Sequence, residues 1–489
     1  MEAFLNLFMG HAPRNYKIAV LAALILNPFL LMIFGPFITG WIILVEFIAT
    51  LALALQCYPL LPGGLLALEL VFMKMVSPQT VKDETFVNFP VILLLMFMVA
   101  GIYFMKDFLA WTFTKILFST NSKILLSLMF CFAGAFLSAW LDALTVVAVV
   151  IAVSVAFYQI YTNTSYEDRV PGQFTSDEHR EKIGHEDLEN FKGFLRNLLM
   201  HAAVGTALGG VSTLVGEPQN LLIGEKMGWN FPQFFLKMAH VSIPVFIAGL
   251  ITCALVEKLK WFGFGFQLPE RVRTVIKKYD EVKTSKRTQT EVISLWMMAL
   301  GAVWLVVSLA LHVAEVGLIG LSVIILMTVL TGKNEEHQIG KAFEESLPFT
   351  ALLVVFFGVV GMIHEQHLFK PVIEWALSFE GNSQLYAFFF ASAALSAISD
   401  NVFVATIYIT EAVNAFKGDI LSEQLNNLAI AINVGTNIPS VATPNGQAAF
   451  LFLLTSAIAG RINLSYTSML KMAFPYTIVL TTTAVFFLI

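Results

Sequence analysis

The sequence has 489 residues, of which 13% are charged and 57% are apolar. A soluble chain carries about 25% charged residues, and at this length it would need them to cover roughly three domains. The composition excludes a cytosolic enzyme, a nucleic-acid-binding protein and a disordered scaffold, and it indicates a polytopic membrane protein. The three cysteines lie in apolar stretches, too scattered for a disulfide framework or a zinc site, and we interpret them as packing residues.

Long apolar segments predict an all-α fold with eleven membrane-spanning helices, because about 17–25 mostly apolar residues suffice to cross a bilayer. In chain order these segments are 17–36, 39–57, 60–76, 88–118, 196–226, 239–260, 292–312, 316–332, 346–378, 427–457 and 470–489. No small-residue cleavage site follows the first of them, so we expect no removable signal peptide.

Two further apolar regions, 123–160 and 384–413, are interrupted in the middle by polar residues. Their halves are about 15–18 residues long, which is short for a span. We therefore expect two re-entrant hairpins, each entering and leaving the membrane on one side. The alternative is two ordinary spans in each region. A hairpin adds no span and the alternative adds two, so in both cases the following loops lie on the same side of the membrane. The charges of the loops therefore do not distinguish the two interpretations.

The charges of the loops orient the chain. The segment 257–291 carries nine Lys and Arg residues, and the positive-inside rule places it in the cytoplasm. Counting spans from this segment places the remaining basic loops on the same side: Arg14 and Lys17, the segment 161–197, Lys333 and Lys341, and Arg461 and Lys471. We therefore expect a cytoplasmic N-terminus and an external C-terminus, with 161–197 as a solvated cytoplasmic linker.

An internal repeat relates the two halves of the chain. A shift of 258 residues aligns Leu137–Asp142 with Leu395–Asp400, and the same shift aligns Pro90 with Pro348. Further on, the offset falls to 226 and aligns Gly209 with Gly435 and Pro218 with Pro444. Each repeat holds five spans and one hairpin, and because five is odd, the second copy is expected to be inverted. Inverted repeats with broken helices are typical of secondary transporters, although a duplicated scaffold without transport is an alternative.

The repeat predicts a division of the chain into four parts. Residues 1–38 form an N-terminal segment with the first span, and 261–291 form a cytoplasmic basic linker. The first repeat covers 39–260, with scaffold helices, the hairpin 123–160 and a broken helix at 196–226. The second repeat covers 292–489, with scaffold helices, the hairpin 384–413 and a broken helix at 427–457.

Two aspartates occupy equivalent positions at the polar centres of the hairpins, Asp142 and Asp400. A carboxylate at bilayer depth costs about 2.5–3.5 kcal/mol on insertion scales. A medium of low dielectric constant favours the protonated acid, whereas an adjacent sodium ion favours the carboxylate, so such a group can exchange a proton for a cation. The alternative is that each aspartate only caps the second helix of its hairpin.

Glycine and proline interrupt the apolar segments 196–226 and 427–457, and an unwound turn there would free backbone groups that need partners. We expect a cation and proton site in which oxygen donors near the breaks assist the two aspartates, although capping of the unwound turns would also explain these donors. At the hairpins the candidates are Thr145, Ser399 and Asn401; at the broken helices they are Thr213, Glu217, Asn220, Thr436, Asn437, Thr443 and Asn445.

Three other acids lie in or near predicted spans: Glu46, Glu69 and Glu315. Each could relay protons, but an interfacial position or a contact between helices would explain it equally well. The pairs Lys106-Asp107 and His364-Glu365 lie in the distal parts of long segments and are expected to anchor the membrane interface.

With these residues identified, the chain resembles the NhaB family of bacterial sodium/proton antiporters. This family belongs to an ion-transporter superfamily that also includes divalent-anion/sodium symporters. The resemblance covers nearly the whole chain, and its most specific stretches are Phe136–Val150, Gly205–Gly210, Gly216–Asn220, Ser399–Val404 and Asn437–Phe450.

The resemblance implies electrogenic exchange of cytoplasmic Na⁺ or Li⁺ for external H⁺ across the bacterial inner membrane, serving salt tolerance and pH homeostasis. It implies no cofactor and no nucleic-acid partner. It also implies a transport domain that moves against a scaffold in an elevator-like mechanism, hairpins that enter from opposite sides of the lipid bilayer, and a homodimer.

Two other functions are weighed against antiport. The related anion symporters carry a Ser-Asn-Thr motif at the hairpin tips, but here Asp142 replaces it in the first hairpin and Ser399-Asp400-Asn401 stands in the second. A carboxylate at each tip would repel a dicarboxylate and attract a cation, which favours the antiporter. An aspartyl intramembrane protease also uses two aspartates, but its Gly-x-Gly-Asp signature is absent.

Overall fold

The computed structural model describes residues 2–164, 177–333, 335–344 and 346–489. These residues form helices and connecting loops, and no β-strand occurs among them. Six of the described helices are long and apolar enough to cross a membrane, and the bent pair Pro78–Val87 and Phe89–Tyr103 would make a seventh span. The predicted class, an all-α polytopic membrane protein, is confirmed, while the number of eleven spans stays a prediction.

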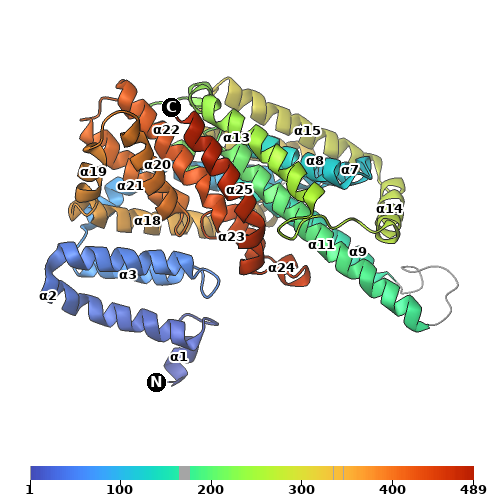
Figure 1. Cartoon of the computed structure of the whole chain (residues 1–489), viewed down its shortest axis with the longest axis horizontal. Helices are drawn as coiled ribbons and strands as arrows, with labels where there is room; N and C mark the ends of the chain where they lie inside the picture. Colours follow the sequence, from blue (N-terminus) through green and yellow to red (C-terminus); the bar gives the residue numbers. More distant parts are fainter. Residues whose placement is uncertain (1, 165–176, 334, 345) are drawn as a thin grey trace.

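Two N-terminal helices, α2 (Arg14–Ala52) and α3 (Leu60–Phe72), lie side by side at one end of the molecule (Figure 1). Helix α1 (Glu2–Leu7) precedes them in the chain, and α4 (Pro78–Val87) follows them. Helix α2 is sharply kinked at Gly35, whose φ of 74° and ψ of 176° are not helical, and Pro36 follows. Glycine adopts a positive φ without steric cost. The two arms of α2 therefore correspond to the first two predicted spans.

Two long predicted segments are each divided in the structure. Residues 88–118 form α5 (Phe89–Leu93), the π-helix η1 (Leu94–Met98), α6 (Val99–Tyr103) and α7 (Lys106–Ser119), and residues 346–378 form α18 (Leu347–Glu365) and α19 (Lys370–Leu377). One straight helix over either segment would be about 45–50 Å long, whereas the hydrocarbon core is about 30 Å thick. The expectation of a single helix in each was wrong, and the polar pairs Lys106-Asp107 and His364-Glu365 lie at the helix ends beside the breaks.

The two predicted hairpins and the two predicted broken helices are interrupted where the polar residues stand. The hairpin helices are α8 (Lys123–Ser138), α9 (Ala143–Asn163), α20 (Asn382–Ser396) and α21 (Asn401–Ala415). The broken helices are α11 (Asp177–Gly210) with α12 (Pro218–Met227), and α22 (Glu423–Asn437) with the 3₁₀-helix η2 (Pro439–Ala442), α23 (Ala448–Thr455) and α24 (Ala457–Arg461).

One part of the predicted 161–197 linker is helical, because α11 begins at Asp177 and continues without a break into the apolar segment. Residues 165–176 of this linker lie outside the described residues. The basic linker 261–291 also contains a helix, α14 (Glu270–Ser285), which buries Val272 and Ile276. The remaining helices are α13 (Phe231–Leu259), α15 (Gln289–Ala310), α16 (Val316–Thr331), α17 (Glu336–Glu344) and α25 (Tyr466–Phe487).

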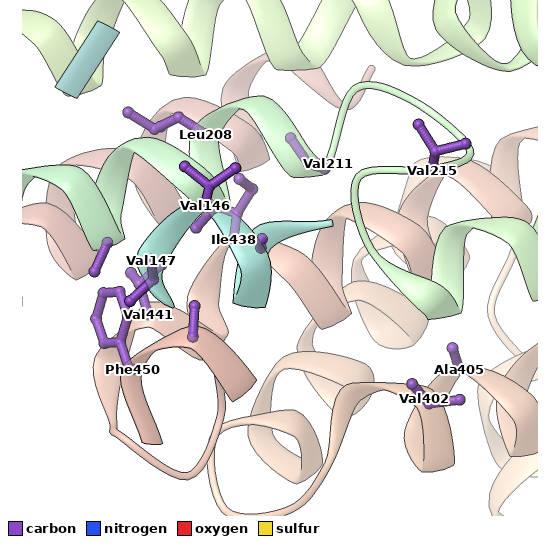
Figure 2. Packing of buried hydrophobic residues seen from close by; sticks show 14 of the residues in the cluster. Val146, Val147, Leu208, Val211, Val215, Val402, Ala405, Ile438, Val441 and Phe450 are labelled. Atoms are coloured by element: carbon purple, nitrogen blue, oxygen red, sulfur yellow. The ribbon is translucent and has the colours of Figure 1, made fainter. Parts of the chain in front are cut away.

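The packing of hairpins and broken helices follows the same plan in both halves. Helix α8 packs against α11, and α20 packs against α22. The second parts cross over, because α12 packs against α21 and α23 packs against α9. Figure 2 shows Val147 of α9 beside Val441 and Phe450 of the second broken helix. This correspondence supports the predicted repeats, and their inversion stays a prediction.

Glycines bring the first helices of these pairs into close contact. A Cβ atom on Gly205 would lie 2.2 Å from the carbonyl oxygen of Cys131, and one on Gly209 would lie 1.8 Å from that of Ala135. In the second half, a Cβ on Gly435 would lie 2.6 Å from the carbonyl oxygen of Phe389. Small residues allow such close approach between membrane helices.

Replacement of Gly209 by alanine is expected to destabilise the contact between α8 and α11, because the two backbones would have to separate. Overpacking of this kind costs about 1–3 kcal/mol. Thermal unfolding in detergent, followed by fluorescence, should show a lower melting temperature for Gly209→Ala. The matched control is Gly340→Ala, because nothing lies within 4 Å of a Cβ atom built there. Equal melting temperatures for both variants would contradict the close contact.

Candidate functional site

The tip of the first hairpin is held by Asp142. Its backbone is extended, with φ −60° and ψ 137°, and it is the N-cap of α9. Its Oδ2 accepts hydrogen bonds from the backbone NH of Thr145 at 3.2 Å and from the Thr145 hydroxyl at 3.4 Å. Asp142 is buried, so one oxygen of a buried acid caps the helix.

The tip of the second hairpin has the same construction. Asp400 is the N-cap of α21, and its Oδ1 accepts from the backbone NH groups of Val402 at 2.8 Å and Phe403 at 3.3 Å. The two tips differ in their serine. Ser396 of the second tip donates to Asn401 and to the carbonyl oxygen of Thr436. The equivalent Ser138 is buried, and its hydroxyl has no hydrogen-bond partner among the described atoms.

The first broken helix is closed by side chains from its own half. Asn220 Nδ2 donates to the carbonyl oxygens of Gly210 at 2.6 Å and Thr213 at 2.7 Å, which lie on the other side of the break. The Thr213 hydroxyl donates at 2.6 Å to the carbonyl oxygen of Ala139 at the first hairpin tip. Two carbonyl groups at the break, those of Gly210 and Thr213, are therefore satisfied by the protein.

The second broken helix is closed in a similar way. Gln447 Nε2 donates to the carbonyl oxygen of Asn437 and to the hydroxyl of Ser440, both at 2.9 Å. The Thr443 hydroxyl donates to the carbonyl oxygen of Ala397, which is the repeat equivalent of Ala139. In each half, a threonine of the broken helix thus holds the tip of the neighbouring hairpin.

Amides join the two broken helices to each other. Asn437 Nδ2 donates to Asn220 Oδ1 at 3.0 Å, and Gln219 Nε2 donates to Asn437 Oδ1 at 2.9 Å. All three side chains are buried. The second part of the first broken helix is therefore fixed to the first part of the second one.

A third acid, Glu217, belongs to the same region. It lies in the first break, immediately before α12, and is buried without capping that helix. Its Oε1 has no hydrogen-bond partner among the described atoms. Glu217 interacts electrostatically with both Asp142 and Asp400. The hairpin tips and the first break thus bring three acids into one electrostatic group.

A cavity of about 540 Å³ opens at Asp400, one of these acids. From the hairpins and the second broken helix it is lined by Leu144, Thr145, Asp400, Asn445 and Ala448, and from the surrounding helices and loops by Leu51, Tyr58, Leu95, Val99, Ser346 and Pro348. The amide of Asn445 donates to the carbonyl oxygens of Leu51 at 3.0 Å and Ala52 at 2.7 Å, at the end of α2. The cavity therefore lies between the hairpin tips and the predicted scaffold helices.

The structure separates the predicted site residues into two sets. Thr145, Asp400 and Asn445 line the cavity, and Asp142 and Glu217 lie in the same group of acids. The others make hydrogen bonds within the breaks and tips: Thr213, Asn220, Ser399, Asn401, Thr436, Asn437 and Thr443. Within the described part of the chain, no three acidic, histidine or cysteine side chains converge closely enough to hold a metal ion.

Several residues of this region were absent from the predicted site. Gln219 is next to the predicted Asn220 in the sequence, Ser396 is four residues before Asp400, and Gln447 is two residues after Asn445, and these positions within the predicted breaks could have suggested a structural role. Tyr58 lines the cavity from the loop between α2 and α3. Nothing in its local sequence distinguishes it, because its contribution depends on how distant helices pack.

A second buried polar cluster lies away from the cavity. Lys123 Nζ lies 2.9 Å from Glu257 Oε1, and His201 Nε2 lies 2.7 Å from the same oxygen. The other ring nitrogen of His201 is 2.8 Å from the Tyr476 hydroxyl, and the backbone NH of Gly265 donates to Glu257 Oε2 at 3.0 Å. These side chains join α8, α11, α13 and α25, which the sequence did not indicate.

An all-α membrane protein with two interrupted hairpins, two broken helices and buried acids beside a cavity belongs to the class of secondary transporters. The chain is a member of the bacterial Na⁺/H⁺ antiporter B (NhaB) family, whose model matches residues 1–488. This confirms the family resemblance inferred from the motifs.

Three relatives show the extent of the similarity. The chain is 56% identical over 479 residues to the Na⁺/H⁺ antiporter NhaB of Shewanella denitrificans, covering 98% of this chain and 90% of the relative. It is 56% identical over 482 residues to that of Pseudomonas fluorescens, covering 98% and 96%. It is 58% identical over 475 residues to that of Escherichia coli O1:K1, covering 97% and 92%.

Replacement of Glu257 by alanine is expected to destabilise the protein strongly, because Lys123 and His201 would remain buried without their shared acceptor. Breaking a buried ion pair from one side costs about 3–5 kcal/mol. The fraction of Glu257→Ala protein that stays monodisperse after heating, measured by size-exclusion chromatography, should fall well below that of the parent protein.

The matched control is Glu281→Ala. Glu281 lies 3.9 Å from Lys277, and both side chains are more than half exposed, so the pair contributes about 0–1 kcal/mol. A Glu257→Ala protein as heat-resistant as Glu281→Ala would show that the buried cluster does not stabilise the four helices.

Proposed function

We propose that the protein is an electrogenic antiporter that exports cytoplasmic Na⁺ or Li⁺ in exchange for external H⁺. Membership of the Na⁺/H⁺ antiporter B family supports this proposal. The observation that carries it is the group of three acids at the hairpin tips and the first break: Asp142 and Glu217 are buried, and Asp400 lines a cavity formed by both halves of the chain.

The acids provide the chemistry of exchange. Asp142 and Asp400 each use one oxygen to cap a helix, and Glu217 has an oxygen without a partner. A buried carboxylate is costly unless it is paired or protonated. The group can therefore hold protons or a cation, and binding of one favours release of the other. Competition for the same oxygens couples the two ions without any further component.

The remaining ligands of a bound cation would come from the walls of the cavity. Na⁺ is a hard cation that favours oxygen ligands, as Ca²⁺ and Mg²⁺ do. The Thr145 hydroxyl and the Asn445 amide lie at the cavity beside Asp400, and Asn445 Oδ1 has no partner among the described atoms. We assign the cation site to this wall, with Asp142 and Glu217 as the neighbouring acids.

The position of the cavity supports alternating access. One wall comes from the hairpin tips and α23, and the other from the ends of α2, from η1, α6 and α18. In our proposal the hairpins and broken helices form a transport domain that moves against the other helices, as in an elevator. We further propose a bacterial inner-membrane location, a cytoplasmic N-terminus, inverted repeats and a homodimer in the lipid bilayer.

Asp142→Asn and Asp400→Asn are each expected to reduce exchange strongly while preserving the fold. Asparagine caps a helix as well as aspartate does, so it keeps the hydrogen bonds to the backbone and removes the exchangeable charge. Hydrogen bonds to charged groups contribute about 1.5–3 kcal/mol, so we expect a loss of Na⁺-driven proton flux of about tenfold or more. Proteoliposomes with a pH gradient and a pH-sensitive dye measure this flux, and a potential-sensitive dye tests electrogenicity.

The matched control is Asp419→Asn. Asp419 is exposed and does not line the cavity, and among the described residues its carboxylate accepts from the backbone NH of Leu421 alone. Full exchange in both Asp142→Asn and Asp400→Asn would show that these residues serve only as caps. Sodium-dependent uptake of a labelled dicarboxylate without proton movement would instead identify a symporter.

A further inference from the structure

A second pair of acids lies in the N-terminal helices, joined by one amide. Asn27 Nδ2 donates to Glu46 Oε2 and to Glu69 Oε2, both at 2.9 Å. Asn27 lies on the first arm of α2, Glu46 on the second arm and Glu69 on α3. Asn27 is completely buried, at 0% exposure, and Glu69 is 8% exposed. None of the three lines the cavity described above.

The cluster lies deep within an apolar region. Asn27 is 13 residues beyond Arg14 at the start of α2, or about 20 Å along a helix at 1.5 Å per residue, and Glu46 lies opposite it across the kink at Gly35. Intramembrane acids are costly and rare in the absence of a function. The kink brings the two arms together, so the geometry of α2 itself places the amide between the two carboxyl groups.

No cation balances these two acids among the charged groups of the described elements packed against them. On α2, Lys17 Nζ is occupied by the carbonyl oxygens of Leu5 and Gly10, at 2.7 and 2.6 Å. On α18, His364 pairs with Glu84, and Glu365 accepts from Ser77 and Thr80. Arg14 is exposed at the start of α2, and Asp400 and Glu411 lie on α21, which contacts α2 through Phe47 and Phe403. Beside Phe369, which packs against Trp41 of α2, His367 is exposed and Lys370 is exposed and lies 3.9 Å from Glu374.

One acceptor of the cluster lacks a hydrogen-bond donor, and one added proton would supply it. Both hydrogens of the Asn27 amide are directed at acids, and its Oδ1 has no donor among the described atoms. If one proton is added and the amide makes a half-turn, Oδ1 takes the place of Nδ2 between the two acids, and the protonated acid can donate to it. This single change gives the buried oxygen a donor and removes one of two neighbouring charges. An unpaired buried acceptor costs about 1–3 kcal/mol, so the protonated form is favoured.

We propose that Asn27, Glu46 and Glu69 form a second proton-binding site, separate from the transport cavity, in which the two acids share one proton. The site does not depend on which ion the cavity transports. It is connected to the cavity by the second arm of α2, because Leu51 and Ala52 at the end of that arm accept the hydrogen bonds of Asn445. Phe47, next to Glu46, also packs against Phe403 near the second hairpin tip, with ring centroids 5.5 Å apart.

Infrared difference spectroscopy on the purified full-length protein tests the proposal, because a protonated carboxyl group has a carbonyl absorption that a carboxylate lacks. We expect Glu46→Gln and Glu69→Gln each to lose the same single carboxylic-acid band, and the double variant to lose nothing further. Glutamine has the shape of protonated glutamate and can donate to Asn27 Oδ1, so both single variants should fold. If only one of them folds, the loss of the band in that variant still tests the proposal. The matched control, Glu315→Gln, changes an exposed acid and should keep the band.

Three results would overturn the proposal. A band that is unchanged in a folded single variant would show that the acids carry no proton. Two different bands that are lost additively in the double variant would show independent acids. Loss of the band on addition of Na⁺ at constant pH, in a protein whose cavity is inactivated by Asp142→Asn, would show a sodium site instead.

Discussion

The architecture depends on one constraint, namely that backbone groups released by a helix break inside a membrane have no water to bind and must be satisfied by the protein. In the first half, Asn220 reaches back across the break to the carbonyl groups of Gly210 and Thr213. In the second half, Gln447 does the same for Asn437. Because Asn437 also bonds Gln219 and Asn220, the two breaks stabilise each other in addition to the bonds that each makes within its own half.

This constraint determines which side chains remain for ions. The hydroxyl and amide groups near the breaks are the natural oxygen donors for a cation, yet most of them hold backbone groups, as Thr213 holds Ala139 and Thr443 holds Ala397. The acids are different, because a carboxyl group has more acceptor positions than one cap uses. Asp142, Asp400 and Glu217 therefore retain acceptor positions for a proton or a cation, and in the proposed site Asn445 and Thr145, which line the cavity, supplement them.

The positions of the breaks could be predicted from the sequence, because glycine and proline act locally and the offset of 258 residues marks equivalent tips. The family could also be predicted, since its motifs lie in these same stretches. The hydrogen-bond partners of the polar side chains could not be predicted from the sequence. Asn220 and Asn437 are 217 residues apart, and no periodicity links them. The division of the 88–118 and 346–378 segments, the early start of α11 at Asp177 and the contribution of Tyr58 likewise depend on tertiary packing. A polar residue beside a glycine predicts an unusual backbone, but it does not tell whether its side chain serves that backbone or an ion.

The two hairpin tips are equivalent in backbone but not in chemistry, and this difference bears on transport. Asp400 lines the cavity and is partly exposed, whereas Asp142 is 3% exposed and lies behind Thr145. The second tip has Ser396, Asn401 and Ser440 in one hydrogen-bonded set, while Ser138 at the first tip has no partner among the described atoms. In this conformation one acid therefore faces the cavity and its counterpart is enclosed. In the proposed exchange this inequality has a use, because an acid open to both sides at once would let protons leak through. A movement that exposes Asp142 would then open the proposed site to the other side.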